Sequence, residues 1–238
     1  LNKIIAIINN NASIPNAPKS AYKIFISNGI VPSQEYPVPG GDRYVSVSEE
    51  VKSALGKKGY DSTIIRNGID CERFNSTKPI HKKLKNVLVI SNKQSAQKSI
   101  FQIINEACKE LNLKITVLGL NFGTAQWNVE EFINQNDLVI SLGRGALEGM
   151  ACKRNVLICD YQGIDGMINN KSYLEIRKNN FSGRRYRGSI SKDIIIKELK
   201  KYNYKQGERN RKLILQHHNI NNTVQNYLDL YKYRELNI

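Results

Sequence analysis

The fold is decided by the stretch DLVISLGRGALEGMACKRNVLICD, residues 137–160. It begins with an apolar, β-branched run at 137–142, which is typical of a strand buried in a parallel sheet. A helical pattern follows at 145–153, and a second apolar strand is predicted at 155–160. Two strands joined by a helix at this spacing indicate a right-handed crossover. We therefore expect an α/β fold, with helices on both faces of a Rossmann-like parallel sheet.

The same alternation continues on both sides of this stretch. Further strands are predicted at 4–8, 23–27, 43–48, 62–68, 86–91 and 114–120. Further helices are predicted at 49–59, 99–111, 129–135 and over 194–236, the last with polar breaks near 203–207 and 219–222. The polar, basic segment at 76–86 is expected to be a linker between two domains.

Composition and charge narrow the classes of partner. The chain has 238 residues and a formal net charge of +15, which suits nucleic acid, an anionic membrane surface or phosphate-bearing small molecules. No helix-turn-helix, zinc pattern or aromatic RNA-binding strand supports nucleic acid. No run reaches the roughly 20 apolar residues that span a bilayer. We expect a cytoplasmic protein, with peripheral binding to the inner face of a membrane as an open alternative.

The cysteines and histidines do not form a ligand pattern. The four cysteines each lie in or beside an apolar run, so buried thiols in a reducing compartment are expected. The three histidines have no cysteine or acidic residue at ligand spacing. We therefore predict no structural metal.

Three loops at predicted strand ends carry candidate chemistry, because ligands of parallel sheets bind there. In the first, 141–148, Gly143, Arg144 and Gly145 precede a helix, and Glu148 is expected in its first turn. Such glycines let a phosphate approach the backbone, and a carboxylate accepts hydrogen bonds from ribose hydroxyls. The structural alternative is a tight turn, with Glu148 only offsetting the helix dipole.

The other two loops are weaker signals. Lys93 and Lys98 flank a helix start in the loop 91–99, where two cations would hold a diphosphate or would simply be solvated. Gly163 and Asp165 belong to a loop expected at 161–168. Glycine and aspartate are also common in turns without function.

Four stretches, taken in order, resemble the retaining GT-B glycosyltransferases of family 4. They are VSEEVKSAL (47–55), IIRNGIDCERF (64–74), ISNKQSAQKS (90–99) and NDLVISLGRGALEGMA (136–151). In the second, Asn67, Gly68 and Asp70 match the family's N-G-V-D turn, which ends its first domain.

The resemblance extends to the donor site. Lys93 and Lys98 fall where the family's Arg and Lys hold the donor diphosphate, and Glu148 matches its ribose-binding Glu. Three departures stand out. Ile140 replaces the family's first Glu, which touches the donor sugar, Asp165 is one place away from the family's acidic position, and Lys93 loses the bidentate geometry of Arg.

The resemblance implies a domain plan. Residues 1–76 would be a remnant of the acceptor-side Rossmann-like domain, 77–215 the nucleotide-sugar-binding domain, and 216–238 a helix that packs back on the N-terminal part. The first domain is much shorter than the family's. A partner chain that completes it is therefore one expected partner.

The implied function is a hexosyltransferase-type glycosyltransferase that retains anomeric configuration and needs neither metal nor cofactor. Its donor would be a nucleotide sugar, and its acceptor a glycan, a lipid-linked molecule or a protein. Three alternatives stay open: an inactive nucleotide-binding fragment, a nucleic-acid-binding protein, and an NAD-dependent oxidoreductase in which Asp160 binds an adenosine ribose.

Overall fold

The chain forms two compact units. A computed structural model describes residues 5–9, 17–95 and 97–232, so Ile4 and residues 233–238 of the expected elements lie outside the described residues. Unit 1 comprises Leu1–Asn67, Lys178–Asn180 and Thr223–Ile238, and unit 2 comprises Gly68–Arg177 and Phe181–Asn222. The first boundary between them lies at Asn67–Gly68, before the basic segment at 76–86.

Unit 1 contains a small parallel sheet. Its strands, in spatial order, are β1 (Ile5–Ile8), β2 (Tyr22–Ser27), β3 (Arg43–Ser46) and β4 (Thr63–Ile64). Helix α1 (Glu49–Gly56) starts where Ser48 Oγ accepts the Val51 N–H at 3.3 Å, a side-chain N-cap. A short 3₁₀ helix occupies Ser33–Glu35.

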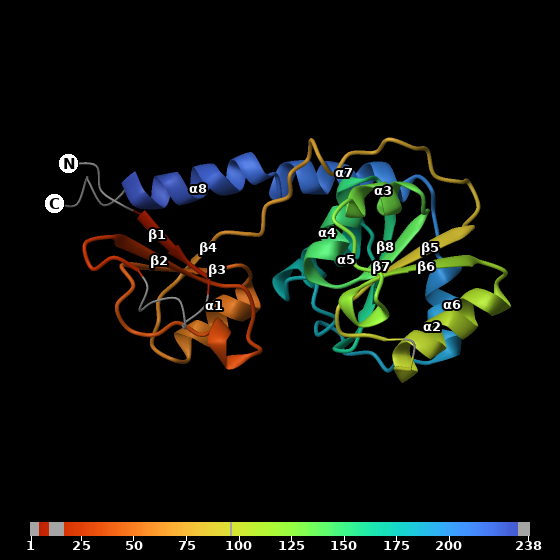
Figure 1. The fold of residues 1–238 in the computed structure, drawn as a ribbon, viewed down its shortest axis with the longest axis horizontal. Coiled ribbons are helices and arrows are strands. Elements are labelled where there is room, and N and C mark those ends of the chain that lie inside the picture. The colour runs from red at the N-terminus through yellow and green to blue at the C-terminus, as the bar shows by residue number, and fades with distance from the viewer. Residues whose placement is uncertain (1–4, 10–16, 96, 233–238) are drawn as a thin grey trace. The chain divides into compact units, whose positions relative to one another are not determined.

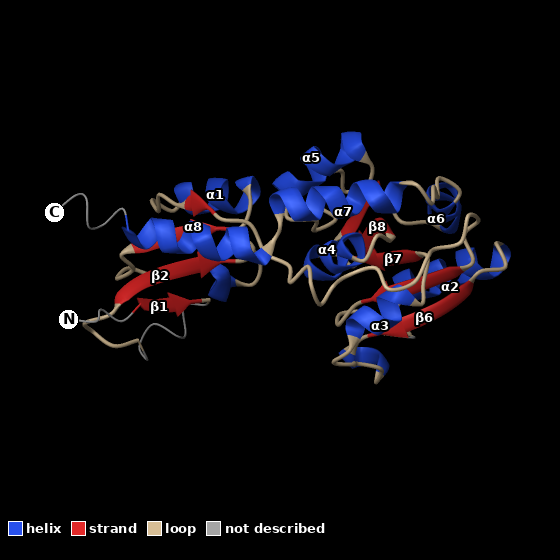
Figure 2. Ribbon diagram, turned by 90° about the horizontal axis from the view of Figure 1, so that it is seen from above, coloured by secondary structure: helices blue, strands red, loops and turns tan. Residues whose placement is uncertain are grey.

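The last helix, α8 (Ile220–Lys232), belongs mostly to unit 1 and runs alongside its strands (Figure 2). Tyr227, Leu230 and Tyr231 of α8 pack against the apolar cluster that β2, β3 and α1 form. The ring of Tyr231 also meets that of Tyr22 edge-on, with centroids 5.4 Å apart.

Unit 2 contains a five-stranded sheet with the order β6-β5-β7-β8-β9. Its strands are β5 (Asn86–Ile90), β6 (Lys114–Leu118), β7 (Leu138–Ser141), β8 (Asn155–Asp160) and β9 (Gly163–Met167). Strands β5 to β8 pair in parallel, and β9 runs antiparallel to β8. The expectation of a loop at 161–168 is therefore wrong for Gly163–Met167.

Helices cover both faces of this sheet, as Figure 1 shows for α2 and α6 on one side and α3, α4 and α7 on the other. The helices of unit 2 are α2 (Ser99–Glu110), α3 (Val129–Asn134), α4 (Gly143–Ala151), α5 (Asn170–Lys178), α6 (Lys192–Leu199) and α7 (Gln206–His217). A short 3₁₀ helix, η3, occupies Leu120–Phe122.

Alternation along the strands explains the two layers. In β7, Val139 faces the cluster formed with α4 and α7, whereas Leu138 and Ile140 face the cluster formed with α2 and α6. Since both faces are apolar, the strands are continuous hydrophobic runs, which is why the sequence reveals them. The predicted α/β fold, with mainly parallel strands between helices, is confirmed.

All four cysteines are buried and free, as predicted. Within residues 5–9, 17–95 and 97–232, no helix has the length and apolar character needed to cross a membrane.

Asp137 ties the segment before β5 to the start of β7. Its carboxylate is 2% exposed and accepts the backbone N–H groups of His81, Lys85 and Asn86 at 2.9–3.0 Å. Burial alone would raise the pKa of Asp137, but these hydrogen bonds and the His81 ring outweigh it and lower the pKa below its ordinary value.

We expect Asp137→Asn to lower the free energy of unfolding by about 2–3 kcal/mol at pH 7, because an amide cannot satisfy all of these donors. A depressed pKa in the folded state gives stability that is present above the unfolded pKa and is lost as pH falls through the folded pKa. The difference between wild type and variant should therefore shrink below about pH 4. Urea titrations between pH 3 and 7 measure it, with the exposed Glu72→Gln as control. A pH-independent difference would contradict the account.

Candidate functional site

A pocket of about 540 Å³ opens at the carboxyl ends of β5, β6 and β7 in unit 2. Its lining includes Asn92 after β5, Gly119 and Leu120 after β6, and Arg144 and Glu148 from α4 after β7. The chain passes from β5 to β6 on one side and then to β7 on the other, so this is the topological switch point of the sheet. Open parallel sheets bind their ligands at such a point.

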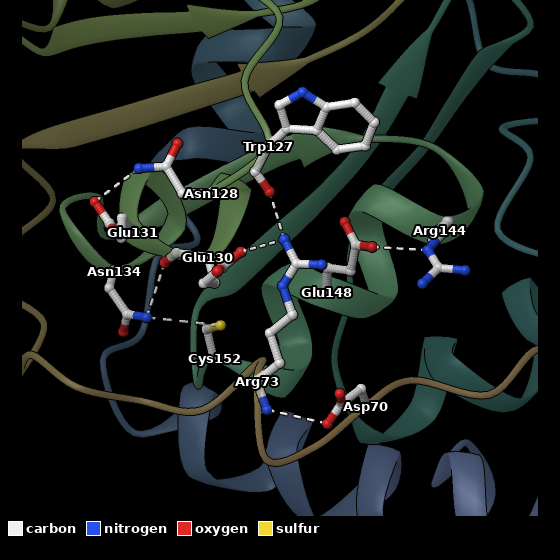
Figure 3. A network of polar contacts seen from close by, with 10 residues as sticks. All are labelled: Asp70, Arg73, Trp127, Asn128, Glu130, Glu131, Asn134, Arg144, Glu148 and Cys152. Atoms are coloured by element: carbon white, nitrogen blue, oxygen red, sulfur yellow. Dashed lines mark hydrogen bonds and ion pairs between the residues drawn. The ribbon is translucent and has the colours of Figure 1, made fainter.

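Glu148 is the buried carboxylate of this pocket. It is 9% exposed, and its Oε1 accepts a hydrogen bond from Arg144 Nε at 2.8 Å (Figure 3). The Arg144 side chain is itself 69% exposed and can move with little cost. Because α4 begins at Gly143, Glu148 lies in its second turn, and the expectation of a first-turn position is wrong. Offsetting the helix dipole therefore does not account for this residue, because that effect fades beyond the first turn.

The pKa of Glu148 differs from that of an exposed glutamate. Burial raises its pKa above the ordinary value of a glutamate, although the guanidinium groups of Arg144 and Arg73 act in the opposite direction. A carboxylate that burial makes costly to ionise gains from the hydrogen-bond donors that a ligand brings.

An arginine fixes the neighbouring wall of the pocket. Arg73 Nη2 donates to the backbone oxygen of Trp127 and, at 2.9 Å, to Glu130 Oε2 (Figure 3). Asp70 Oδ1 accepts the Glu72 and Arg73 N–H groups at 3.0 Å, which shapes the turn that carries Arg73. The hydrogen bond from Arg73 lowers the pKa of Glu130.

Trp127 stands at the rim of the pocket with its side chain free of the core. It lines the pocket and is 93% exposed. An exposed indole at the edge of an apolar pocket is a platform on which a flat ring can stack.

The glycines before α4 have structural partners. A Cβ on Gly145 would lie 2.5 Å from Ser141 Oγ, so close packing of α4 on β7 requires glycine there. The Gly143 N–H donates to the Phe181 carbonyl at 2.8 Å. The start of α4 has no side-chain cap, so its first turn can still present N–H groups to an anion.

The loop after β5 reaches the pocket through Asn92 rather than through its lysines. Lys93 and Lys98 are exposed and do not line the pocket. Ser91 Oγ donates to Asp160 Oδ2 at 2.6 Å and accepts the Lys93 and Gln94 N–H groups. Asp160 therefore holds this loop in place. The same carboxylate would have to bind the ribose in the NAD-dependent alternative, so the two roles compete.

The remaining predicted site residues lie outside the pocket. Asp165, on β9, accepts the backbone N–H groups of Arg185 and Tyr186, at 3.2 and 2.7 Å. Gly163 begins β9. In unit 1, Asn67 Nδ2 donates to Asn180 Oδ1 at 3.3 Å. Asp70 supports the pocket wall only through the turn that carries Arg73. Gly163 and Asp165 belong to β9, an edge strand of the sheet.

One departure from the motif of family 4 lies inside the sheet. Ile140, which stands where the resemblance places a sugar-binding Glu, is a fully buried residue of β7. Sequence reasoning missed Asn92, Arg73 and Trp127. Of these three, Trp127 carried a signal in the sequence, because it is the single tryptophan of the chain and lies in the polar stretch TAQWNVEE.

Comparisons of the chain with protein-family models and with curated proteins give no match. Among the described residues, no group of three or more His, Cys, Asp or Glu side chains is placed to hold a metal ion.

Proposed function

We propose that this pocket binds the nucleoside diphosphate of a nucleotide sugar and that the chain transfers the sugar to an acceptor. The observation that carries the proposal is Glu148, a buried carboxylate at the switch point of a parallel sheet. The two hydroxyls of a ribose would donate hydrogen bonds to it, and charge-assisted bonds of this kind are strong in a partly dry site.

The rest of the pocket suits the rest of a nucleotide. Leu118, Leu120 and Val129 make its walls apolar, and Trp127 offers a stacking surface for the base. Arg144 and the uncapped start of α4 would face the diphosphate. Lys93 and Lys98 remain candidates for the same role through the resemblance alone, after movement of their loop.

The proposed transfer step depends on the negative charge that develops on the departing diphosphate. The bond between the anomeric carbon and the diphosphate oxygen breaks, and a bond to an acceptor oxygen forms. The proton of the acceptor hydroxyl passes to the departing diphosphate or to water. The departing diphosphate gains negative charge, which Arg144 and the N–H groups of α4 would stabilise in the transition state. Retention of configuration is an expectation from the resemblance to family 4.

A melting experiment tests ligand class. The melting temperature of unmodified protein should rise with one of UDP, GDP, CDP or ADP, because a ligand that binds only the folded state stabilises it. A larger rise with NAD would favour the oxidoreductase, and a salt-sensitive rise with an oligonucleotide would favour nucleic acid. No rise with any nucleoside diphosphate would contradict the proposal.

Sugar transfer is measured separately, because the melting temperature reports only binding. When the sugar form of the stabilising nucleotide is incubated with the protein, transfer of the sugar to an added acceptor, or more slowly to water, should release free nucleoside diphosphate. Arg144→Ala should lower the rate of release about tenfold or more. The matched control is Lys109→Ala, an exposed cation on α2. Binding without release, even with candidate acceptors present, would identify an inactive nucleotide-binding relative instead.

A further inference from the structure

A second pocket, of about 640 Å³, lies at the other end of the sheet in unit 2. Lys153 and Arg154, which line it, immediately precede β8, so it opens at the amino end of that strand. The charged residues of its lining are Lys153, Arg154, Lys205, Glu208, Arg209 and Lys212. We call it the basic pocket, because five of these six groups are cations.

One wall of the basic pocket is a face of α7. Lys205, Arg209 and Lys212 recur at helical spacing along it. Glu208 pairs with Lys153, at 2.8 Å between Nζ and Oε1. Within the described part of the chain, no acidic side chain lies within ion-pair distance of Lys205, Arg209 or Lys212, so their charge is uncompensated.

Arg154 supplies an independent observation. Its side chain has no exposed surface, and Nη2 donates to the Lys78 carbonyl at 2.6 Å and to Asn134 Oδ1 at 2.8 Å. Its Nε and Nη1 are buried and have no hydrogen-bond partner in the described structure. Burial lowers the pKa of this guanidinium, and the nearby Cys152, Asp137 and Tyr202 only partly oppose that effect.

A buried, incompletely bonded guanidinium is costly unless an anion approaches it. Asp137 does not fill this role by contact, because its oxygens accept N–H groups from His81, Lys85 and Asn86. The basic pocket places three uncompensated lysine and arginine side chains beside the same group. A concave pocket of about 640 Å³ suits a small ligand, whereas a membrane or a nucleic-acid duplex presents an extended surface.

We infer that the basic pocket is a binding site for a small soluble molecule that carries phosphate groups, separate from the pocket of Glu148. Its volume is that of ordinary small-molecule sites. The phosphates would pair with the exposed Arg209 and Lys212 and would offset the charge of the buried Arg154 at longer range.

Calorimetric titration of the full chain with pyrophosphate, in about 0.15 M salt, tests the inference. We expect saturable binding that Arg209→Ala combined with Lys212→Ala weakens at least about tenfold, since two charge-assisted contacts are lost. The double variant Lys109→Ala, Lys114→Ala makes the same charge change at exposed sites elsewhere in unit 2 and should bind as wild type does.

Arg144→Ala separates the two pockets, because pyrophosphate could also enter the first one. Binding that survives Arg144→Ala and is weakened by the α7 double variant supports the inference, whatever becomes of the proposed transferase. Loss with Arg144→Ala alone, equal weakening in both double variants, or no binding of pyrophosphate would overturn it. Binding only to phosphatidylglycerol vesicles or to an oligonucleotide would overturn it too. Circular dichroism verifies that each variant is folded.

Discussion

Glu148→Gln is expected to weaken binding of the cognate nucleoside diphosphate about 100-fold, because two charge-assisted hydrogen bonds from the ribose lose their anionic acceptor. The side chain keeps its size, so the pocket keeps its shape. Equilibrium titration compares the two proteins. Glu131→Gln, which makes the same charge change at an exposed position of α3, should bind within about threefold of wild type.

The same substitution should act in the opposite direction on stability. The pKa of Glu148 is raised by burial, so ionising this group costs stability once pH exceeds the unfolded pKa. Glu148→Gln should therefore melt at a higher temperature than wild type near pH 7, and the difference should vanish below about pH 4. Loss of the Arg144 contact opposes this only weakly, since Arg144 is largely exposed. A variant that binds normally but melts lower would indicate a purely structural carboxylate.

Gly207→Ala is expected to lower the free energy of unfolding by about 3 kcal/mol or more. Gly207 is the second residue of α7, and a Cβ there would lie 2.0 Å from the carbonyl oxygen of Lys153. Both sides of this contact are backbone, so neither can move aside as a flexible side chain would. The helix would have to shift away from the turn before β8.

Urea titration followed by circular dichroism measures this loss. Gly56→Ala is the control, because a Cβ at Gly56, in α1, would meet nothing within 4 Å. That variant should be neutral or gain up to about 1 kcal/mol from helix propensity. A Gly207→Ala protein as stable as the Gly56→Ala protein would mean that α7 does not approach the turn so closely.

Strands β5 to β8 of unit 2 were predictable because both faces of each strand pack against apolar clusters. Their β-branched runs, such as NVLVI at 86–90, stand out from polar surroundings. The glycine-led start of α4 and the presence of Glu148 at a strand end followed from the same pattern. Helix α5 was missed because only Tyr173 and Ile176 of its nine residues are buried, which leaves no apolar stripe. Strand β9 was missed because GIDGM is typical of a turn.

The pocket itself depends on contacts that sequence spacing cannot give. Arg73 and Trp127 are far apart along the chain, and their hydrogen bond exists only because the turn at Asp70 meets the loop before α3. Likewise, Lys93 and Lys98 follow a strand end as predicted, but Asn92 is the residue of that loop that reaches the pocket. The types of residue in these loops indicated that an anion could bind there. Only the folded structure shows which of their side chains face the pocket.

The most direct test of the central claim uses Trp127 as its own reporter, since the chain has a single tryptophan. Its fluorescence should change saturably with one nucleoside diphosphate. The change should be absent with pyrophosphate alone, strongly weakened in Glu148→Gln, and retained when Arg209 and Lys212 are both replaced by Ala. If none of UDP, GDP, CDP or ADP alters the fluorescence of the folded protein, the pocket of Glu148 and Trp127 is not a nucleotide site.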